Sequence, residues 1–412
     1  MEKRNWTKSG IILVVAALLA TFTMTASNAT TLKVGIIADF TGTASVTSGP
    51  LALGMIDYLK YVNDSKKGVE GNLIDIDWVD GKFKTSLAPE AYHRMKGQNA
   101  LTVVAVNSPY VKGVMPFIVK DQMPLMTVAN NLPFVYKVDP NFPSEWVYSS
   151  GGCAAEEYTE FVRWALANWK EKRPIRLALV YPDDSYGKAL VQGFPDWVKK
   201  QKGVEIVGEA LLPSMNVDDA TPYLIKIKKF EPDYVLVRLM ANGIAVFLKD
   251  AKRVGMTAPI VGNYVGKPGD IERLVASPDL LDQFMIADSY GVLEDTGWGM
   301  VLADKLAKKY QGKDLKAMGS MYWMGVGTAM IMEEALRLAV KSEGAAHLNS
   351  ALLKTKGYDR ITHLDTGGIM GTVTVKPGDH RGAVQNRIIG YKNGKLKVLR
   401  DWTNNEPFVN VK

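Results

Sequence analysis

Residues 32–63 read LKVGIIADFTGTASVTSGPLALGMIDYLKYVN, and they place a short apolar run next to a stretch of helical period. The first part, Leu32 to Ala38, is apolar enough for a buried strand. Between Pro50 and Asn63 the apolar residues recur at spacings of three and four, as on one face of a helix: Ala52, Met55, Ile56, Leu59 and Val62. The stretch therefore predicts a strand followed by a helix, which is the repeating unit of α/β folds.

The same alternation of apolar runs and helical periods continues along the chain. In the first half it predicts strands at 73–79, 101–106 and 125–128, with helices at 89–98 and 111–120. After 149–152 it starts again, with strands at 176–180, 204–210, 234–238 and 260–261 and helices at 156–169, 188–200, 221–229 and 243–254. Strands that alternate with helices form a parallel sheet covered on both faces. The chain is therefore predicted to contain two α/β lobes.

The last third of the chain does not begin a third domain. It predicts a strand at 280–287, helices at 298–310 and 321–341, and β-rich segments at 371–376 and 387–399. Asn393-Gly394 lies between apolar runs and indicates a two-residue hairpin turn. These elements complete both lobes, so the chain must cross between the lobes more than once, and the crossing segments form a hinge.

The first 29 residues have the features of a secretory signal peptide. Three basic residues precede an apolar segment at 11–20, and small residues at 27–29 suit a cleavage site. A retained membrane anchor is the alternative, but the apolar segment is shorter than the roughly 20 residues that a span requires. Cys153 is the only cysteine, which excludes an intramolecular disulfide and a lipid-anchored cysteine at the mature N-terminus. The mature protein is expected to be free and soluble in the periplasm.

The composition is that of a globular protein, with 47% hydrophobic and 23% charged residues among 412. Removal of 1–29 takes away three bases and one acid and lowers the formal charge from +7 to +5. The remaining basic residues are scattered along the chain, so nucleic acid is not an expected partner.

Catalytic and metal-binding patterns are missing from the sequence. The four histidines have no metal-ligand spacing, the single cysteine has no partner for a zinc site, and no G-x-S-x-G motif occurs. Residues 262–268 are one residue short of a P-loop and lack the Ser or Thr that would hold magnesium. The sequence predicts a protein that is not an enzyme and that uses no metal or cofactor.

Polar and aromatic side chains gather where four predicted strands end, at 40–43, 107–110, 129–131 and 181–187. In open parallel sheets, ligands bind beyond the carboxyl ends of the strands, where helix N-termini offer free N–H groups. Ser108 is expected to cap the helix that follows it. The alternative is that these residues form ordinary turns and caps. The candidates for ligand contact at these ends are Thr41, Asn107, Ser108, Tyr110, Ala129, Asn130, Asn131 and Tyr186.

Several segments follow one another in the order and spacing of a known family. They are 32–36 before Thr41-Gly42, 181–187, 230–237, and 251–255 followed by 259–262. With this ordered set, which covers nearly all of the mature chain, the protein resembles the periplasmic substrate-binding proteins of ABC transporters. The similarity is to the group that contains the leucine/isoleucine/valine-binding proteins.

This resemblance implies a type I periplasmic binding protein fold, an α/β fold of two Rossmann-like lobes with parallel-sheet cores joined by a three-crossover hinge. The crossovers are expected near 148–151, 289–291 and 363–371. The signal peptide, 1–29, is then followed by a first lobe of 30–149 and 291–363 and a second lobe of 150–290 and 364–412.

The resemblance also implies where the ligand is held. In the family, the strand end that matches Ser108 and the loop that matches 129–131 hold a carboxylate from the first lobe. The second lobe closes with an aromatic residue that matches Tyr186, with residues that match 239–242, including Asn242, and with an acidic residue that pairs the ammonium of the ligand.

The chain departs from the amino-acid binders at that acidic position. It has Asn263 and Tyr264 there, and none of the possible substitutes, Asp39, Asp184 and Asp288, matches the motif. A buried ammonium without an anionic partner is costly, and binders of aromatic acids, urea and short amides share the scaffold. Several aromatic residues lie at or near expected cleft positions and suit a planar ligand: Tyr110, Tyr186, Tyr264, Tyr322 and Trp323. For Tyr322 and Trp323, packing in the core of a long helix is an equal alternative.

The expected function is that of the periplasmic solute-binding component of an ABC importer. It would capture a small amino acid-like or aromatic carboxylate or amide between two lobes by hinge closure, and deliver it as a monomer to the ABC permease subunits. The alternative is a ligand-sensing domain that reports to a membrane receptor or regulator.

Overall fold

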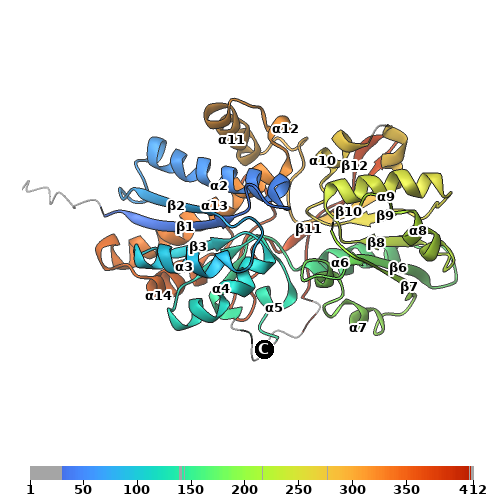
Figure 1. Cartoon of the computed structure of the whole chain (residues 1–412), viewed down its shortest axis with the longest axis horizontal. Coiled ribbons are helices and arrows are strands. Elements are labelled where there is room, and N and C mark those ends of the chain that lie inside the picture. Colours follow the sequence, from blue (N-terminus) through green and yellow to red (C-terminus); the bar gives the residue numbers. More distant parts are fainter. Residues whose placement is uncertain are drawn as a thin grey trace, which may run out of the picture.

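The structure is a computed structural model, and it describes residues 30–138, 142, 144–215, 217–275, 277–407 and 409. The predicted signal peptide, 1–29, lies outside the described residues. Two β-sheets lie side by side along the longest axis of the molecule, each with its own helices (Figure 1). The sequence-based prediction of two α/β lobes is confirmed.

The first sheet has five strands, all parallel, in the order β2-β1-β3-β4-β5. The strands are β1 (Leu32–Ala38), β2 (Ile74–Asp80), β3 (Thr102–Ala105), β4 (Leu125–Thr127) and β5 (Val147–Ser149). The residues of β3, β4 and β5 are all buried, because helices cover both faces of this sheet. We call this sheet, with the helices packed on it, the first lobe.

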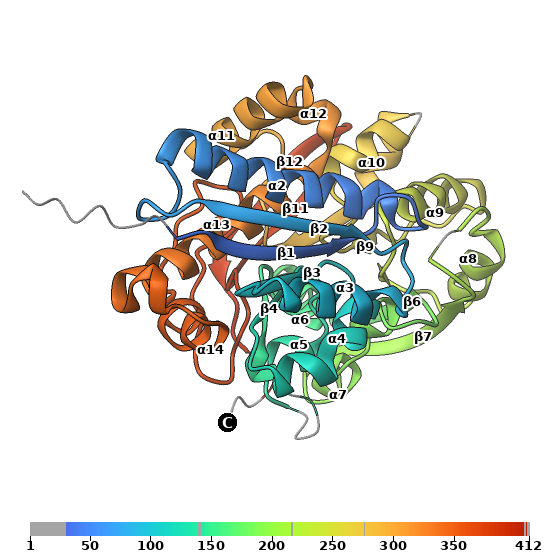
Figure 2. The same cartoon turned by 60° about the vertical axis from the view of Figure 1, so that its left-hand side comes forward.

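The helices of the first lobe come from both ends of the described chain. They are α2 (Ser45–Lys66), α3 (Leu87–Gly97), α4 (Ser108–Lys120), α5 (Leu132–Val135), α11 (Trp298–Leu306), α12 (Leu315–Met318), α13 (Ser320–Glu343) and α14 (Ser350–Leu352). Helix α2 lies along β1 and β2 (Figure 2). The helix begins at Ser45, earlier than Pro50, which is the start that the sequence pattern predicts. Within the described ranges, no helix is both long and apolar enough to cross a membrane.

Helices α2 and α13 approach each other closely at two glycines. A Cβ atom on Gly54 would lie 2.0 Å from the backbone oxygen of Tyr322, and one on Gly325 would lie 2.0 Å from that of Leu51. The two backbones nearly touch at these points, so no residue larger than glycine fits there. The contact brings the C-terminal third of the chain into the core of the first lobe.

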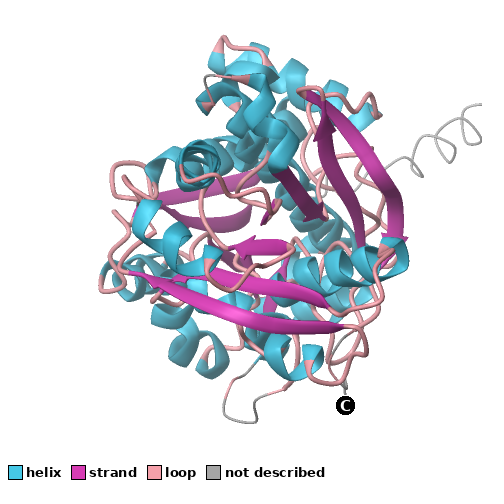
Figure 3. Ribbon diagram, turned by 90° about the vertical axis from the view of Figure 1, so that its right-hand side faces the viewer, coloured by secondary structure: helices cyan, strands magenta, loops and turns pink. Residues whose placement is uncertain are grey.

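The second sheet has seven strands in the order β12-β11-β10-β9-β8-β6-β7. The strands are β6 (Ile175–Pro182), β7 (Val204–Leu212), β8 (Tyr234–Val237), β9 (Ile260–Gly262), β10 (Phe284–Asp288), β11 (Gln385–Lys392) and β12 (Lys395–Asn404). The first five of these are parallel, while β11 and β12 are antiparallel to their neighbours. In Figure 3 this sheet faces the viewer, with helices on both sides. We call it and its helices the second lobe.

The helices of the second lobe are α6 (Ala154–Asn168), α7 (Phe194–Val198), α8 (Thr221–Lys228), α9 (Ala241–Arg253) and α10 (Pro268–Leu274). The single helix predicted at 188–200 is wrong. A 3₁₀ turn ends at Leu190, and the short α7 begins only after Gly193, whose φ of 79° no regular helix tolerates. Further 3₁₀ or π turns lie at Ser144–Trp146, Pro278–Gln283, Ala307–Gln311, Ala345–His347, Leu353–Gly357 and Tyr358–Arg360.

The predicted hairpin near the C-terminus is confirmed. Asn393 and Gly394, with φ of 54° and 68°, form the turn between β11 and β12, as a type I′ turn requires. The segment predicted to be β-rich at 371–376 makes isolated bridges, such as that between Val373 and Leu364, rather than a continuous strand.

Three segments connect the lobes and are bonded to one another. The chain passes to the second lobe after β5, returns after β10, and crosses again through 361–384 before β11. The backbone N–H of Ala383 donates to the oxygen of Ser150 (3.0 Å), and that of Gly371 donates to the oxygen of Ser289 (3.0 Å). These hydrogen bonds hold the three crossovers together, as expected of a hinge.

Candidate ligand-binding site

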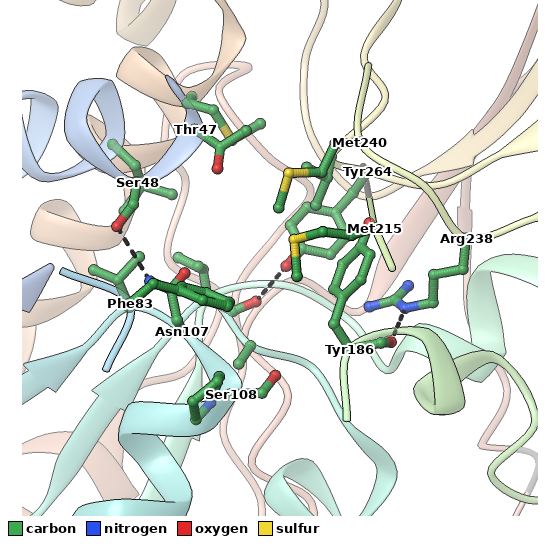
Figure 4. A pocket seen from close by; sticks show the side chains of 17 residues that line it. Thr47, Ser48, Phe83, Asn107, Ser108, Tyr186, Met215, Arg238, Met240 and Tyr264 are labelled. Carbon is green, nitrogen blue, oxygen red and sulfur yellow. Dashed lines mark hydrogen bonds between the residues drawn. The ribbon is translucent and has the colours of Figure 1, made fainter. Parts of the chain in front are cut away.

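A cavity of about 50 Å³ lies between the two lobes (Figure 4). Most of its lining comes from loops and first helical turns that follow strands of both sheets, which is where open α/β sheets bind ligands, and Met321 adds the start of α13. The second lobe contributes Tyr186, Met215, Arg238, Met240, Tyr264 and Val265. The first lobe contributes four neutral polar residues, Thr47, Ser48, Asn107 and Ser108, among apolar neighbours. Among the described residues of this lining, Arg238 is the only one with a charge.

The polar side chains of the first lobe are already hydrogen-bonded within that lobe. Ser108 Oγ donates to Asn131 Oδ1 (2.9 Å), and Asn107 Nδ2 donates to Ser48 Oγ (3.4 Å). Asn107, not Ser108, occupies the N-cap position of α4, and its side chain makes no capping bond. The prediction that Ser108 caps this helix is therefore wrong, because Ser108 is its first residue and its hydroxyl reaches Asn131 instead.

Arg238 follows β8 and extends into the space between the lobes (Figure 4). It is only 1% exposed. Its Nε donates to the backbone oxygen of Tyr186 (2.8 Å), and its Nη2 donates to Asn130 Oδ1 of the first lobe (2.9 Å). Its Nη1 has no hydrogen-bond partner among the described residues. Both N–H groups of Nη1 in this buried guanidinium therefore lack a hydrogen-bond partner among the described residues, and Glu157 Oε2 lies 3.8 Å from this atom.

Two tyrosine rings flank this guanidinium. Its central carbon lies 4.7 Å from the ring centre of Tyr186 and 5.9 Å from that of Tyr264, within the range of cation–π attraction. Burial raises the pKa of both phenols, so both hydroxyls stay protonated. The Tyr186 hydroxyl donates to Asn263 Oδ1 (3.1 Å), and the Tyr264 hydroxyl crosses to the first lobe, where it donates to the oxygen of Val128 (2.9 Å).

Glu157 lies behind Arg238 and does not line the cavity. Its Oε2 is 3.8 Å from Arg238 Nη1, which is an ion-pair distance but too long for a hydrogen bond. Burial raises the pKa of Glu157 to about 8, although Arg238 acts to lower it. At neutral pH this carboxyl group is therefore mostly protonated, and it leaves the charge of Arg238 uncompensated.

Several contacts between the lobes show that the cleft is closed in this structure. Besides the bonds from Tyr264 and Arg238, Asn131 Nδ2 donates to the backbone oxygen of Ser185 (2.7 Å).

A second cavity of about 490 Å³ adjoins the first and shares Thr47, Met240, Val265 and Met321 with it. The second cavity lies between the start of α2 and helix α10.

Comparison with protein-family models matches residues 31–395 to the periplasmic binding proteins. The chain belongs to this family. The predicted family is confirmed, and so is the fold of two parallel-sheet lobes. Proteins of this family are solute-binding components of ABC transporters rather than enzymes. Comparison with the curated proteins found no match.

Solved structures of other proteins share the fold of this periplasmic binding protein. A branched-chain amino acid ABC transporter protein from Thermus thermophilus with bound valine has a TM-score of 0.82 and 19% identity, over 92% of this chain and 98% of that one. A fatty acid ABC transporter substrate-binding protein from Thermomonospora curvata has a TM-score of 0.76 and 21% identity, over 92% and 93%. Leucine-binding protein LivK from Thermotoga maritima has a TM-score of 0.71 and 15% identity, over 90% and 99%.

Some residues predicted from the sequence come together at the cavity of this binding protein. Those that line it are Asn107, Ser108, Ala129, Tyr186 and Tyr264. Asn242 lines the adjoining cavity instead. Asn130, Asn131 and Asn263 lie one layer behind, where they bond Arg238, Ser108 and Tyr186.

The other predicted residues lie outside both linings. The Thr41 hydroxyl donates to Asp80 Oδ2 (2.5 Å), and the Tyr110 hydroxyl accepts a bond from the Phe83 N–H (2.7 Å). Tyr322 is fully buried between α2 and α13, where its hydroxyl donates to Asp57 (2.9 Å). The alternative of core packing therefore describes Tyr322 better than ligand stacking does.

The sequence analysis missed Arg238, the one charged residue of the lining. The signal was present, because a basic residue follows the apolar run of Tyr234 to Val237 at a strand end. The position suited an exposed end equally well, and the arginine is buried by residues far from it in the sequence, among them Asn130, Tyr186 and Tyr264.

Proposed function

We propose that this periplasmic binding protein captures a small organic solute between its lobes and delivers it to the permease of an ABC importer. The observation that supports the proposal best is the cavity lined from both lobes. A ligand there touches both lobes at once and so favours the closed arrangement over the open one. Closure in turn presents a ligand-bound form that a permease can distinguish from the empty one.

The contacts proposed for the ligand come from both sides of the cleft. Asn107, Ser108 and Ala129 would contact it from the first lobe, and Tyr186, Arg238 and Tyr264 from the second. The bodies that move would be those predicted from the sequence, 30–149 with 291–363 against 150–290 with 364–412. The membership of β1 to β5 and of β6 to β12 in separate sheets supports this division.

The ligands named for two similar proteins support a small carboxylate as the solute. The Thermus thermophilus protein holds valine, and the Thermomonospora curvata protein is described as one for fatty acid. Valine and fatty acids both join a carboxylate to an apolar body. We further infer that the mature chain begins near residue 30 and acts as a free monomer in the periplasm, without catalysis.

A thermal-shift screen of the mature protein tests the proposal. The protein is unfolded and refolded to remove ligand, then heated with amino acids, aromatic acids, short amides, urea and sugars. A ligand at about 100 times its dissociation constant should stabilise the fold by roughly 2.7 kcal/mol, which raises Tm by several degrees. A selective shift in one class supports the proposal. Tm values unchanged across all classes, for refolded protein that melts cooperatively, would contradict it.

A further inference from the structure

We propose that the ligand is a monocarboxylate with an apolar or aromatic body and no charged amine, and that Arg238 binds its carboxylate. This inference rests on the proposed function, and it names the class of solute. It differs from the pattern of amino-acid binders, in which neutral groups of the first lobe hold the carboxylate and an acid of the second lobe pairs the ammonium.

The charges around the cavity argue against an amino acid. Among the described residues, none of the side chains that line the inner cavity is acidic, and the one acid that lines the adjoining cavity, Asp270, is bonded to Ser320 and Arg273. The three acids that the sequence offers as substitutes for the missing one are engaged elsewhere. Asp39 accepts backbone N–H bonds from Gly42 and Ala44, and Asp184 accepts one from Gly187 (2.8 Å). Asp288 forms a fully buried ion pair with Lys267.

Glu157 cannot take the role of the missing acid. It lies behind Arg238, where Asn130 Nδ2 donates to its Oε1 (2.9 Å) and the N–H of Tyr264 donates to its Oε2 (3.3 Å). An ammonium in the cavity would therefore meet the guanidinium before it met this carboxyl group. The two like charges would repel each other in a buried space, which is costly.

The free donor of Arg238 suits a carboxylate. Nε and Nη2 each donate one hydrogen bond, whereas Nη1, which lies 3.8 Å from Glu157 Oε2, has no hydrogen-bond partner among the described residues. A buried, unsatisfied donor on a charged group is costly, and a carboxylate oxygen would satisfy it with a charge-assisted hydrogen bond. Tyr186 and Tyr264 fix the guanidinium plane from the side, so Arg238 is positioned before the ligand arrives.

The rest of the lining suits an apolar body. Phe83, Leu51 and Val106 from the first lobe face Met215, Met240 and Val265 from the second. The inner cavity of about 50 Å³ has room for little more than the carboxylate end, whereas the adjoining cavity holds about 490 Å³ and is lined by the ion pair of Asp270 and Arg273 as well as by apolar residues. The methionines at their junction, Met240 and Met321, have flexible side chains that adapt to the shape of a ligand. The body would extend from Arg238 past these methionines.

Matched trios of compounds test this inference by calorimetric titration of the refolded mature protein. Phenylacetate is compared with phenylacetamide, which lacks the charge, and with phenylglycine, which adds an ammonium. Hexanoate, hexanamide and norleucine form the aliphatic trio. We expect the acid of at least one trio to bind 100-fold or more tightly than its amide and its amino acid. An amino acid or amide that binds as tightly as its acid would overturn the inference.

Substitution of Arg238 tests the residue itself. Arg238→Gln should weaken binding of the preferred acid at least 100-fold while it changes amide binding less than threefold, and Arg238→Lys should recover part of the loss. Arg253→Gln, an exposed arginine on α9, is the control and should bind as the wild type does. Equal losses for acid and amide in Arg238→Gln, in protein that still melts cooperatively, would overturn the assignment. Binding of amino acids, sugars or urea but of neither acid would refute this inference and leave the proposed function standing, whereas binding of no compound in any class would refute both.

Discussion

The two sides of the cleft differ in how far their polar groups are satisfied. On the first lobe, Thr47, Ser48, Asn107 and Ser108 are neutral and each is bonded within its own lobe. On the second lobe, a single buried arginine beside two aromatic rings has its Nη1 without a hydrogen-bond partner among the described residues. The first lobe therefore offers a preformed wall, and the second lobe offers an unsatisfied charge.

This difference indicates which lobe selects the ligand. A neutral hydrogen bond contributes about 0.5–1.5 kcal/mol net, whereas leaving a buried charged group without its partner costs several kcal/mol. Selectivity for charge should then reside in the second lobe, and the first lobe should act mainly through shape. Substitutions on the two sides should have correspondingly unequal effects.

Apart from substitution of Arg238 itself, the largest effect is expected when a negative charge is added to the neutral wall. Ser108→Asp places a carboxylate across the cavity from Arg238, which would pair with the arginine and repel an anionic ligand. We expect phenylacetate or hexanoate to bind about 100-fold more weakly, a loss of roughly 2.7 kcal/mol. The affinity for the matched amino acid should rise relative to the acid.

Calorimetric titration measures both affinities, and Ser108→Asn is the control for size. If Ser108→Asp and Ser108→Asn weaken acid binding equally, the effect is steric and the charge of Arg238 is not what holds the ligand.

The next effect concerns pH. Because burial raises the pKa of Glu157 from 4.5 to about 8, this group is protonated in the folded protein at neutral pH and ionises as the pH passes through about 8. Its negative charge, 3.8 Å from Arg238 Nη1, then competes with a ligand carboxylate. Acid binding should weaken about tenfold between pH 7 and pH 9.

Glu157→Gln should remove this pH dependence, while Glu205→Gln, on the exposed face of β7, should retain it.

The same pKa shift makes a prediction for the stability of the fold. Since the folded state holds the proton more tightly than the unfolded chain does, the contribution of Glu157 to stability is lost as the pH rises from about 4.5 to about 8. Urea unfolding at several pH values should show a smaller loss for Glu157→Gln, and an equal loss would contradict the assignment.

A smaller effect is expected from the ring that flanks the guanidinium. Tyr186→Leu removes the cation–π contact at 4.7 Å and lets Arg238 move. The expected loss of acid affinity is about tenfold, which corresponds to roughly 1.4 kcal/mol. Tyr186→Phe keeps the ring and loses only the bond to Asn263, so it should bind nearly as the wild type does. Tighter binding by Tyr186→Leu than by Tyr186→Phe would argue against a positioning role for the ring.

The smallest effect is expected at the neutral wall itself. Asn107→Ala removes a long hydrogen bond to Ser48 and should weaken acid binding only about threefold. The melting temperature of each variant should be measured beside its affinity, to separate binding from folding. A loss at Asn107 as large as that at Tyr186 would show that the first lobe, not the second, carries selectivity.

The fold could be predicted because buried parallel strands leave a simple pattern. The apolar run at 32–38 became β1, and the spacing in 50–63 became the middle of α2. Predictions failed where single residues interrupt a period. Gly193 ends the helix expected at 188–200, and the segment 371–376 is extended without a continuous partner strand.

The candidate site was harder to predict, because it depends on contacts between distant parts of the chain. The strand-end rule found Ser108 and Tyr186 through their position after β3 and β6. The same reasoning could not predict that Tyr322 lies in the core and outside the cleft, since its hydrogen-bond partner Asp57 lies on another helix. Arg238 lies at the end of a predicted strand and Glu157 within a predicted helix, and nothing in the sequence shows that the fold buries the two side chains 3.8 Å apart.

The most direct test of the account is the distance between the lobes with and without an anionic ligand. Lys60→Cys on α2 and Lys226→Cys on α8 introduce two exposed sites for spin labels, and the single native cysteine, Cys153, is buried and should not react. Saturating phenylacetate or hexanoate should shift the distance distribution measured by electron paramagnetic resonance to a shorter, narrower peak. The same labels in Arg238→Gln should show no shift at that concentration. A distribution that stays unchanged when the acid is bound, or that shifts equally in Arg238→Gln, would contradict closure driven by the charge of the second lobe.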